Sequence, residues 1–327
     1  MKVKLYCKQA AQEKYLDEIF KGYGLDYEAT EDQPSLEDYK ALKGQGFDAV
    51  ISIPHPTSDP EFEAFKEAGV KHVVTQSVGF DHFDREAAKR WGIGIHHAVY
   101  PPQSVASYAV MCILMCARRV HTILEGYRTR DFRINQNRGQ DLSELTVGII
   151  GAGKIGQCVA KRLRGFECKI LCFDIYPNEE LKEFCEYVSM DELLQRSDIV
   201  TLHAFASPEN HHLINAEKLA LMKPTAYIVN TARGDLIDTW ALIDALKNGK
   251  LHGAVLDVIE NESGYYYCDQ RGKEVPAHIA ALEQFPEVTL LQHMAFCTTL
   301  SANEQLRTSI EACYLALNGL PNPYEIK

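Results

Sequence analysis

The stretch VGIIGAGKIG, residues 147–156, reads as a short apolar strand, a glycine turn and the first residues of a helix. This order matches the dinucleotide-binding fingerprint, in which each glycine has its own task. Gly151 permits the tight turn, Gly153 lets the backbone approach a pyrophosphate, and Gly156 lets helix and strand pack closely. The fingerprint also calls for an acidic residue about 20 residues further on, and Asp174 follows the next apolar strand, KILCF at 169–173. The stretch therefore predicts a dinucleotide site.

Strand-like runs alternate with helical patterns along the chain, which predicts an α/β fold with parallel sheets. Two domains are expected at 327 residues, and the glycine turn lies late enough for a whole domain to precede it. The expected strands are 3–7, 49–53, 72–75, 93–96, 145–150, 168–173, 199–202, 226–230, 253–257 and 288–291. The expected helices are 11–23, 36–43, 60–68, 104–125, 154–163, 190–196, 216–221, 239–248 and 301–318. The helix over 104–125 should cross between the domains, and the last helix should return to the first domain.

The composition disfavours several classes of protein. The formal net charge of −11 argues against a nucleic-acid partner, which calls for a basic surface. No apolar run reaches the ~20 residues that span a bilayer, and the start of the sequence reads as a strand rather than a signal peptide. The ten cysteines are dispersed, so reduced thiols are expected. No group of cysteines and histidines has metal-ligand spacing. We therefore expect a cytoplasmic protein with no metal site and no membrane partner.

Two segments that follow expected strands carry groups able to bind or polarise a small acid, and ligands bind at the carboxyl ends of strands in such folds. Arg233 can present its planar guanidinium to a carboxylate and polarise a neighbouring carbonyl, although alone it could be a surface arginine. In the segment 76–82, Gly79 lets backbone N–H groups turn toward a small anion.

Two further segments carry acid–base groups. The strand that ends in Asp257 is followed by Glu260 and Glu262, either of which could orient a histidine and favour its charged form, unless the loop is merely solvated. His293 comes directly after an apolar strand, and histidine is the usual acid–base group at neutral pH. Taken alone, His293 could equally be structural.

Arg233, Glu262 and His293, in this order behind the glycine turn, resemble the D-isomer-specific 2-hydroxyacid dehydrogenase family. The likeness covers nearly the whole chain and is greatest to the D-lactate dehydrogenases, including the vancomycin-resistance type. Segments that carry it are VYPPQSVA (99–106), RLRGF (162–166), SDIVTLH (197–203) and GKLHGAVLD (249–257). The resemblance implies a Rossmann-type doubly wound parallel sheet for NAD, inserted into a smaller flavodoxin-like α/β substrate domain. The expected bounds are 1–100 plus 299–327 for the substrate domain and 101–298 for the NAD-binding domain.

The resemblance also implies roles for single residues. Arg233 would bind the substrate carboxylate and polarise the carbonyl, His293 would donate the proton to the carbonyl oxygen, and Glu262 would hold His293 protonated. The residues expected to bind the cofactor are Gly151, Gly153, Lys154, Ile155, Gly156, Asp174, His203, Ala204, Phe205, Asn210, Thr231, Ala232, Arg233 and Asp257. The residues expected to bind the substrate are Ile53, Val78, Gly79, Tyr100, Arg233, His293 and Phe296. Asp174 would accept hydrogen bonds from the adenosine ribose and repel a 2′-phosphate, so NAD is expected rather than NADP. A homodimer is implied, with the helix from Ser104 as a candidate interface.

The expected reaction is the NADH-dependent reduction of a 2-oxo acid to a D-2-hydroxy acid, and pyruvate to D-lactate is the first expectation. Ile53 lies about where D-lactate enzymes of the family carry an aromatic residue and 2-hydroxyglutarate relatives carry an arginine, so a second carboxylate is not expected. A larger apolar 2-oxo acid, such as phenylpyruvate or 2-ketoisocaproate, is the alternative. Gln292 and Phe205 stand where the family usually has proline, and these departures bear on the substrate more than on the reaction. A non-enzymatic NAD(H)-responsive binding protein on the same fold is the remaining alternative.

Overall fold

The computed structural model describes residues 1–8, 13–134 and 138–327. Contacts between residues divide the chain into two units, Met1–Pro101 with Cys297–Lys327, and Pro102–Phe296. The second unit is therefore inserted into the first. The bounds expected from the sequence lie one or two residues from these.

The first unit is built on a parallel sheet with the strand order β2-β1-β3-β4-β5. Its strands are β1 (Lys2–Leu5), β2 (Asp26–Ala29), β3 (Ala49–Ser52), β4 (His72–Thr75) and β5 (Gly94–His97). This is the order of flavodoxin-like sheets, so that part of the prediction is confirmed. The sequence pattern missed β2, because this edge strand has the polar sequence DYEA and no apolar run.

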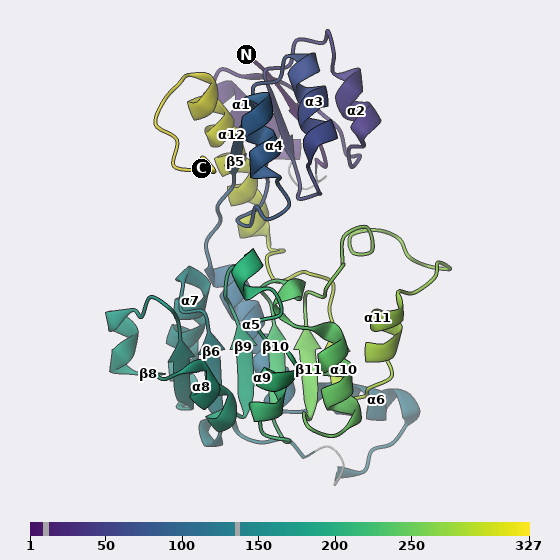
Figure 1. The fold of residues 1–327 in the computed structure, drawn as a ribbon, viewed down its shortest axis with the longest axis vertical. Coiled ribbons are helices and arrows are strands. Elements are labelled where there is room, and N and C mark those ends of the chain that lie inside the picture. Colours follow the sequence, from purple (N-terminus) through teal and green to yellow (C-terminus); the bar gives the residue numbers. More distant parts are fainter. Residues whose placement is uncertain (9–12, 135–137) are drawn as a thin grey trace. The chain divides into compact units, whose positions relative to one another are not determined.

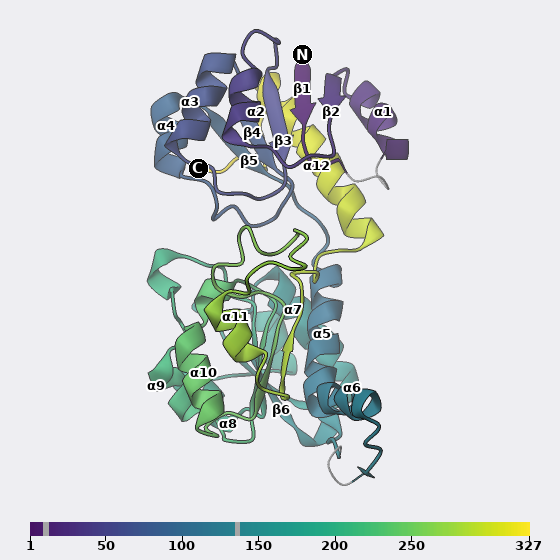
Figure 2. The ribbon, with the colours of Figure 1, turned by 90° about the vertical axis from the view of Figure 1, so that its right-hand side faces the viewer.

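Helices cover both faces of this sheet, as Figure 2 shows. They are α1 (Glu13–Gly22), α2 (Leu36–Ala41), α3 (Asp59–Ala68), α4 (Arg85–Trp91) and α12 (Thr299–Leu317). One face packs against α2, α3 and α4 through a core that includes Tyr39 and Phe62. The other face packs against α1 and α12 through a core that includes Phe20 and Ile310. Helix α12 thus returns to the first unit, as its place after the last expected strand predicted.

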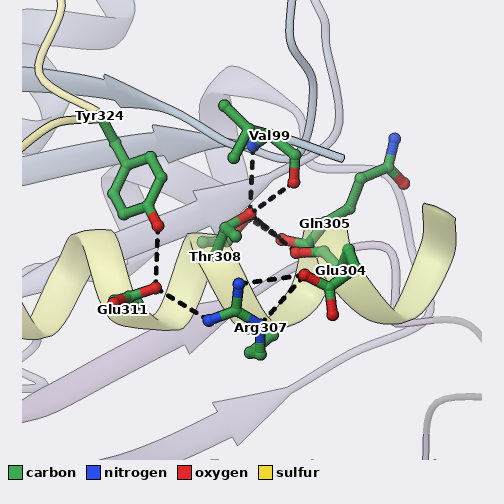
Figure 3. Close-up of polar contacts among 8 residues, drawn as sticks. Val99, Glu304, Gln305, Arg307, Thr308, Glu311 and Tyr324 are labelled. Atoms are coloured by element: carbon green, nitrogen blue, oxygen red, sulfur yellow. Dashed lines mark hydrogen bonds and ion pairs between the residues drawn. The ribbon is translucent and has the colours of Figure 1, made fainter. Parts of the chain in front are cut away.

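Helix α12 is also tied to the segment that follows β5 (Figure 3). The buried Thr308 hydroxyl accepts a hydrogen bond from the Val99 N–H at 3.1 Å and lies 3.0 Å from the Val99 carbonyl oxygen. The Tyr324 hydroxyl donates to the Glu311 carboxylate at 2.8 Å. Because Val99 directly precedes Tyr100, the Thr308 contacts fix the start of a segment expected to line the substrate pocket.

The first unit contains a buried histidine, His96, whose lowered pKa predicts that the folded state loses stability in acid. The His96 ring accepts a hydrogen bond from the Asn322 amide at 3.2 Å and lies 3.2 Å from the His72 ring nitrogen. Burial, with a smaller effect of neighbouring His72 and His97, lowers the pKa of His96 from 6.5 to about 3. Below its ordinary pKa the unfolded chain binds this proton and the folded chain does not, so stability falls as the pH falls.

Because of His96, we expect the free energy of unfolding of the first unit to fall by about 2 kcal/mol as the pH falls from about 6.5 to 5. Urea unfolding at several pH values measures this slope. The His96→Gln variant should show a clearly shallower slope, and an unchanged slope in that variant would contradict the assignment.

The second unit has a parallel sheet with the order β12-β11-β10-β9-β6-β7-β8. Its strands are β6 (Thr146–Ile150), β7 (Lys169–Phe173), β8 (Glu186–Tyr187), β9 (Ile199–Leu202), β10 (Tyr227–Asn230), β11 (Gly253–Leu256) and β12 (Val288–Leu290). The order reverses between β6 and β9, which is the doubly wound pattern of a Rossmann-type domain. The glycine turn follows β6 and therefore lies at this point of reversal, where such sheets bind their ligands.

Helices cover both faces of this sheet too (Figure 1). They are α5 (Gln103–Ala117), α6 (Val120–Thr129), α7 (Lys154–Leu163), α8 (Met190–Arg196), α9 (Ala216–Leu221), α10 (Thr239–Lys247) and α11 (Ala277–Leu282). One core joins α5 and α7 to the sheet through residues such as Ile113 and Val159. The other joins α8, α9 and α10 to it through residues such as Leu193 and Leu242.

The prediction of one helix over 104–125 was wrong. The chain breaks at Arg118 and Arg119 into α5 and α6, which are bent by 64°. Arg119 has a left-handed φ of 49°, and its guanidinium donates to the His252 ring at 2.9 Å. That contact is distant in sequence, so helical periodicity could not reveal it. Within the described residues no single helix is long and apolar enough to cross a membrane; α5 and α6 pass that test together by length and composition alone.

Candidate active site

The glycine turn after β6 has the geometry expected of each glycine. Gly151 has a φ of +94°, and a Cβ there would lie 2.5 Å from the Ala204 backbone nitrogen. A Cβ at Gly156 would lie 2.0 Å from the Gly151 carbonyl oxygen, so helix α7 and the turn touch through bare backbone. Gly153 has no atom within 4 Å of its Cβ position and is the N-cap of α7, which begins at Lys154. The open space over Gly153 and the free N–H groups of α7 fit a pyrophosphate.

Asp174 lies at the carboxyl end of β7, next to the glycine turn. Its carboxylate accepts hydrogen bonds from the Ala152 N–H at 2.6 Å and from the Tyr176 N–H at 2.8 Å. These bonds fix the carboxylate beside the turn, and each oxygen has further acceptor capacity. The arrangement fits the hydroxyls of a ribose joined to a pyrophosphate on α7.

The ends of β9 and β10 present buried polar atoms without partners among the described residues. His203 donates to or accepts from Thr201 Oγ1 through Nε2 at 3.0 Å, whereas its Nδ1 is buried and unpartnered. Burial lowers the pKa of His203 to about 3, so the ring is neutral. Thr231 Oγ1 is likewise buried without a partner. Buried polar atoms are normally hydrogen-bonded, so these two atoms fit a hydrogen-bond partner that is not part of the chain. A cofactor lying over the strand ends would supply one.

The loop after His203 is shaped by Asn210. The Asn210 side chain accepts from the Ser207 N–H at 2.7 Å and donates to the Phe205 carbonyl at 2.5 Å. Its amide therefore holds the loop, while the Phe205 side chain is largely exposed. The expected contact of Asn210 with the cofactor would have to be made with the remaining capacity of this amide.

Arg233 follows β10 in a turn held by a residue that sequence reasoning did not single out. The buried Asn230 accepts from the Ala232 N–H at 3.0 Å and donates to the Arg233 carbonyl at 2.8 Å. The Arg233 guanidinium itself donates to the Ala232 carbonyl at 2.8 Å. A Cβ at Gly234 would lie 2.1 Å from the Ile259 carbonyl carbon, so this turn packs directly on the loop that carries Glu262. The available signal for Asn230 was a polar residue ending an apolar strand.

His293 and Glu262 form the acid–base pair. His293 Nδ1 lies 2.5 Å from Glu262 Oε1, and the other Glu262 oxygen accepts from the Ile259 N–H at 3.1 Å. His293 has a left-handed φ of 53°, an uncommon conformation that recurs at functional sites. With Nδ1 turned to Glu262, Nε2 is the ring nitrogen that can serve a substrate.

The backbone around His293 is held on both sides. The His293 N–H donates to the Asp257 carbonyl at 2.7 Å, and the Tyr267 hydroxyl donates to the His293 carbonyl at 2.9 Å. The Asp257 carboxylate is fully buried and accepts from the N–H groups of Met294 and Ala295, each at 2.9 Å. Asp257 was expected at the cofactor; in the structure its side chain positions the segment 293–295. Sequence reasoning missed Tyr267, since nothing in the run of tyrosines at 265–267 marks it.

The residues alone left open which carboxylate orients His293, the resemblance implied Glu262, and the structure separates the two. The Glu260 carboxylate lies 2.6 Å from the His212 ring nitrogen and accepts a hydrogen bond from the Thr239 N–H at 2.8 Å, whereas the Glu262 carboxylate is bonded to His293. The sequence revealed no histidine pair with a third metal ligand, yet His211, His212 and Glu260 hold possible ligand atoms within 4.8 Å of one another. Because Glu260 is already bonded to His212 and Thr239, we assign no metal there.

Four of the remaining expected substrate residues belong to the first unit, and Phe296 belongs to the second. Ile53 follows β3, Val78 and Gly79 follow β4, and Tyr100 follows β5, so all lie beyond the carboxyl ends of neighbouring strands. The Ser77 hydroxyl donates to the Gly79 carbonyl at 2.6 Å and lies 2.9 Å from Thr75 Oγ1, which shapes that loop. Phe296 lies in the second unit, with its ring centre 6.1 Å from that of His293.

Comparison with known proteins agrees with this arrangement. Residues 110–295 match the family model described as D-isomer specific 2-hydroxyacid dehydrogenase, NAD binding domain. A D-specific alpha-keto acid dehydrogenase of Enterococcus faecium is 41% identical over 274 residues, 83% of this chain and 84% of that protein. An aromatic 2-oxoacid reductase of Clostridium sporogenes is 34% identical over 318 residues, 95% of this chain and 94% of that protein.

Solved structures extend the likeness to the whole chain. The crystal structure of a D-lactate dehydrogenase from Treponema pallidum has a TM-score of 0.88 at 32% identity and covers 100% of both chains. The fold, the NAD-binding domain and the relatives lead to the same assignment. The chain belongs to the D-isomer specific 2-hydroxyacid dehydrogenase family, whose members are NAD-dependent oxidoreductases.

Proposed function

We propose that the protein reduces 2-oxo monocarboxylic acids to D-2-hydroxy acids with NADH, and that pyruvate is its preferred substrate. The observation that carries the chemistry is the Glu262–His293 contact at 2.5 Å, with the His293 backbone held by Asp257 and Tyr267. Such a fixed imidazole is suited to general acid catalysis, because its free nitrogen keeps one direction.

The residues divide the reaction between them. NADH, when bound, supplies the hydride that adds to the carbonyl carbon. His293 donates the Nε2 proton to the carbonyl oxygen, so the product leaves as a 2-hydroxy acid and the imidazole is left neutral. Arg233 binds the carboxylate in a bidentate pair and stabilises the negative charge that develops on the oxygen. In the reverse direction His293 takes the proton back.

The choice of a monocarboxylic acid rests on Ile53, an apolar residue that follows β3 in the substrate unit, and pyruvate is placed first because D-lactate dehydrogenases are among the relatives. It offers no cation for a second carboxylate, and it leaves larger apolar 2-oxo acids as the alternative class. A screen of NADH oxidation with pyruvate, 2-ketoisocaproate, phenylpyruvate, oxaloacetate and 2-ketoglutarate tests the proposal. Preference for either dicarboxylate would overturn it. Tight NADH binding with no turnover on the panel would favour a binding protein instead.

NAD rather than NADP is proposed on Asp174, whose carboxylate is fixed beside the turn by the N–H groups of Ala152 and Tyr176. A fixed negative charge at the ribose repels a 2′-phosphate. The same screen run with NADPH should give clearly lower kcat/KM than with NADH.

The two glutamates offer a matched test of the acid–base pair. Glu262→Gln is expected to lower kcat by about 10²-fold, because a neutral amide neither fixes the tautomer of His293 nor stabilises its charged form. Glu260→Gln is the control, since its carboxylate contacts His212 and Thr239 rather than His293. It should lower the melting temperature and leave kcat within a few fold. Equal losses of kcat in both variants would contradict the assignment of Glu262.

A homodimer is also proposed, through α6 and the residues just beyond it. Large apolar side chains gather there with half or more of their surface exposed, among them Leu124, Tyr127, Phe132 and Ile134. Exposed apolar groups concentrated in one segment mark an interface, and a second copy of the chain is the occupant we expect. Tyr127→Asp should reduce the mass measured by light scattering from dimer to monomer. Trp240→Asp, at an exposed apolar residue of α10, should leave the mass unchanged.

A further inference from the structure

A polar cavity lies in the second unit at the amino ends of its strands, the edge of the sheet opposite the glycine turn. Its volume is about 180 Å³. Tyr227 at the start of β10 and His252 just before β11 line it, together with Arg119 from the break between α5 and α6 and Asp198 just before β9. None of the residues placed in the active site lines this cavity.

Buried polar groups without partners mark the cavity. The Tyr227 side chain is 6% exposed, and its hydroxyl lies beside the Arg119 guanidinium without meeting hydrogen-bond geometry with any described residue. His121 does not line the cavity, but its ring centre lies 6.1 Å from that of Tyr227; it is 9% exposed, and neither of its ring nitrogens has a partner among those residues. Nearly all buried polar atoms in folded proteins are hydrogen-bonded. The Tyr227 hydroxyl, which faces the cavity, can therefore accept a partner that is not part of the chain.

The polar groups that face the cavity are mainly donors. The Arg119 guanidinium donates to His252 Nε2 at 2.9 Å, so His252 is neutral and its proton lies on Nδ1. Burial and, after it, the charge of Arg119 lower the pKa of His252, which favours the same form. The Asp198 carboxylate is already engaged, by Lys223 at 2.7 Å and by the Thr146 N–H at 2.8 Å. Arg119 and Tyr227 are left to bind an acceptor.

The local charge limits what the acceptor can be. Arg119 brings one positive charge to the cavity wall, and the Asp198 charge is offset by Lys223. Glu287 acts on both Tyr227 and His252 from nearby. A polyanion would be repelled by Glu287, whereas a small oxyanion such as acetate or inorganic phosphate can pair with the guanidinium and the hydroxyl.

We propose that this cavity binds a small oxyanion, a carboxylate or a phosphate, held by the Arg119 guanidinium and the Tyr227 hydroxyl. The ligand would contact the amino ends of β10 and β11. The carboxyl ends of the same two strands carry Asn230, which holds the turn of Arg233, and Asp257, which holds the segment of His293. The cavity and the active site therefore share two strands and no residues.

Isothermal titration calorimetry on the NADH-saturated protein tests the proposal, because bound NADH keeps the probe away from the glycine turn. Inorganic phosphate and acetate are titrated separately, and the one that binds identifies the class of ligand. Arg119→Lys and Tyr227→Phe are each expected to raise the dissociation constant by about tenfold or more. Arg118→Lys is the matched control, since Arg118 is an exposed neighbour that does not line the cavity, and it should bind as the wild type does.

Thermal melting gives a second readout with a distinctive sign. Tyr227→Phe removes a buried hydroxyl that has no partner, so the anion-free variant should melt at or above the wild-type temperature. The rise that the anion causes in the wild type should be absent from the variant. If the cavity holds only water, neither probe will bind the wild type, or all variants will bind alike, and either result overturns the proposal.

Discussion

Replacing His293 with glutamine is expected to lower kcat for 2-oxo acid reduction by about 10²–10⁴-fold, the usual contribution of a general acid. The reason lies in how the imidazole is held. Nδ1 is committed to Glu262 at 2.5 Å, so only Nε2 can deliver a proton to the substrate. Glutamine has a polar end but no group that can act as an acid near neutral pH. NADH oxidation at saturating pyruvate measures the loss, which equals about 3–5 kcal/mol of transition-state stabilisation.

A neighbouring histidine supplies the control for this variant. The His278 ring lies 3.1 Å from the Glu260 carbonyl and is not bonded to Glu262, so His278→Gln should keep kcat within a few fold. The affinity for NADH, measured by fluorescence, should be unchanged in both variants. Turnover by His293→Gln at the wild-type rate would remove His293 from the mechanism.

The parts of the fold that could be predicted from the sequence are those that depend on residues close together along the chain. The glycine turn could be predicted because the local backbone requires glycine at each position. Gly151 has a φ of +94°, and a Cβ at Gly156 would lie only 2.0 Å from a carbonyl oxygen. Arg233 and His293 became candidates because each follows an apolar strand of a parallel sheet, and their roles came from the resemblance of their joint order with Glu262 to the family. In such sheets, residues at the strand ends face ligands.

What the sequence could not supply depends on contacts between distant segments. The break between α5 and α6 is fixed by Arg119 and His252, and no helical pattern records that pairing. The resemblance implied that Asp257 contacts the cofactor, and the sequence held no sign that its carboxylate also binds N–H groups that follow another strand. Glu260 and Glu262 are equivalent by composition, so only the resemblance pointed to Glu262; in the structure the course of the loop brings Glu262 to His293 and Glu260 to His212.

Gly234→Ala is expected to impair stability and catalysis together, because the position joins the two halves of the catalytic set. A Cβ there would lie 2.1 Å from both the carbonyl carbon and the oxygen of Ile259, and 2.5 Å from the Glu260 nitrogen. All three are backbone atoms, so no side-chain rotation can relieve the clash. One of the two chain segments must move, and overpacking of this kind costs about 1–3 kcal/mol of unfolding free energy.

The same movement should shift Arg233 relative to the Glu262–His293 pair. Arg233 directly precedes Gly234, and the Ile259 N–H bonds the Glu262 carboxylate that holds His293. A shift of about 1 Å between catalytic groups costs about 10²-fold in rate, so kcat should fall by that order even in the fraction that remains folded. Gly165→Ala is the matched control, because its Cβ position has no atom within 4 Å. If Gly234→Ala melted and turned over as the wild type does, the turn of Arg233 and the loop of Glu262 would not be in the contact described here.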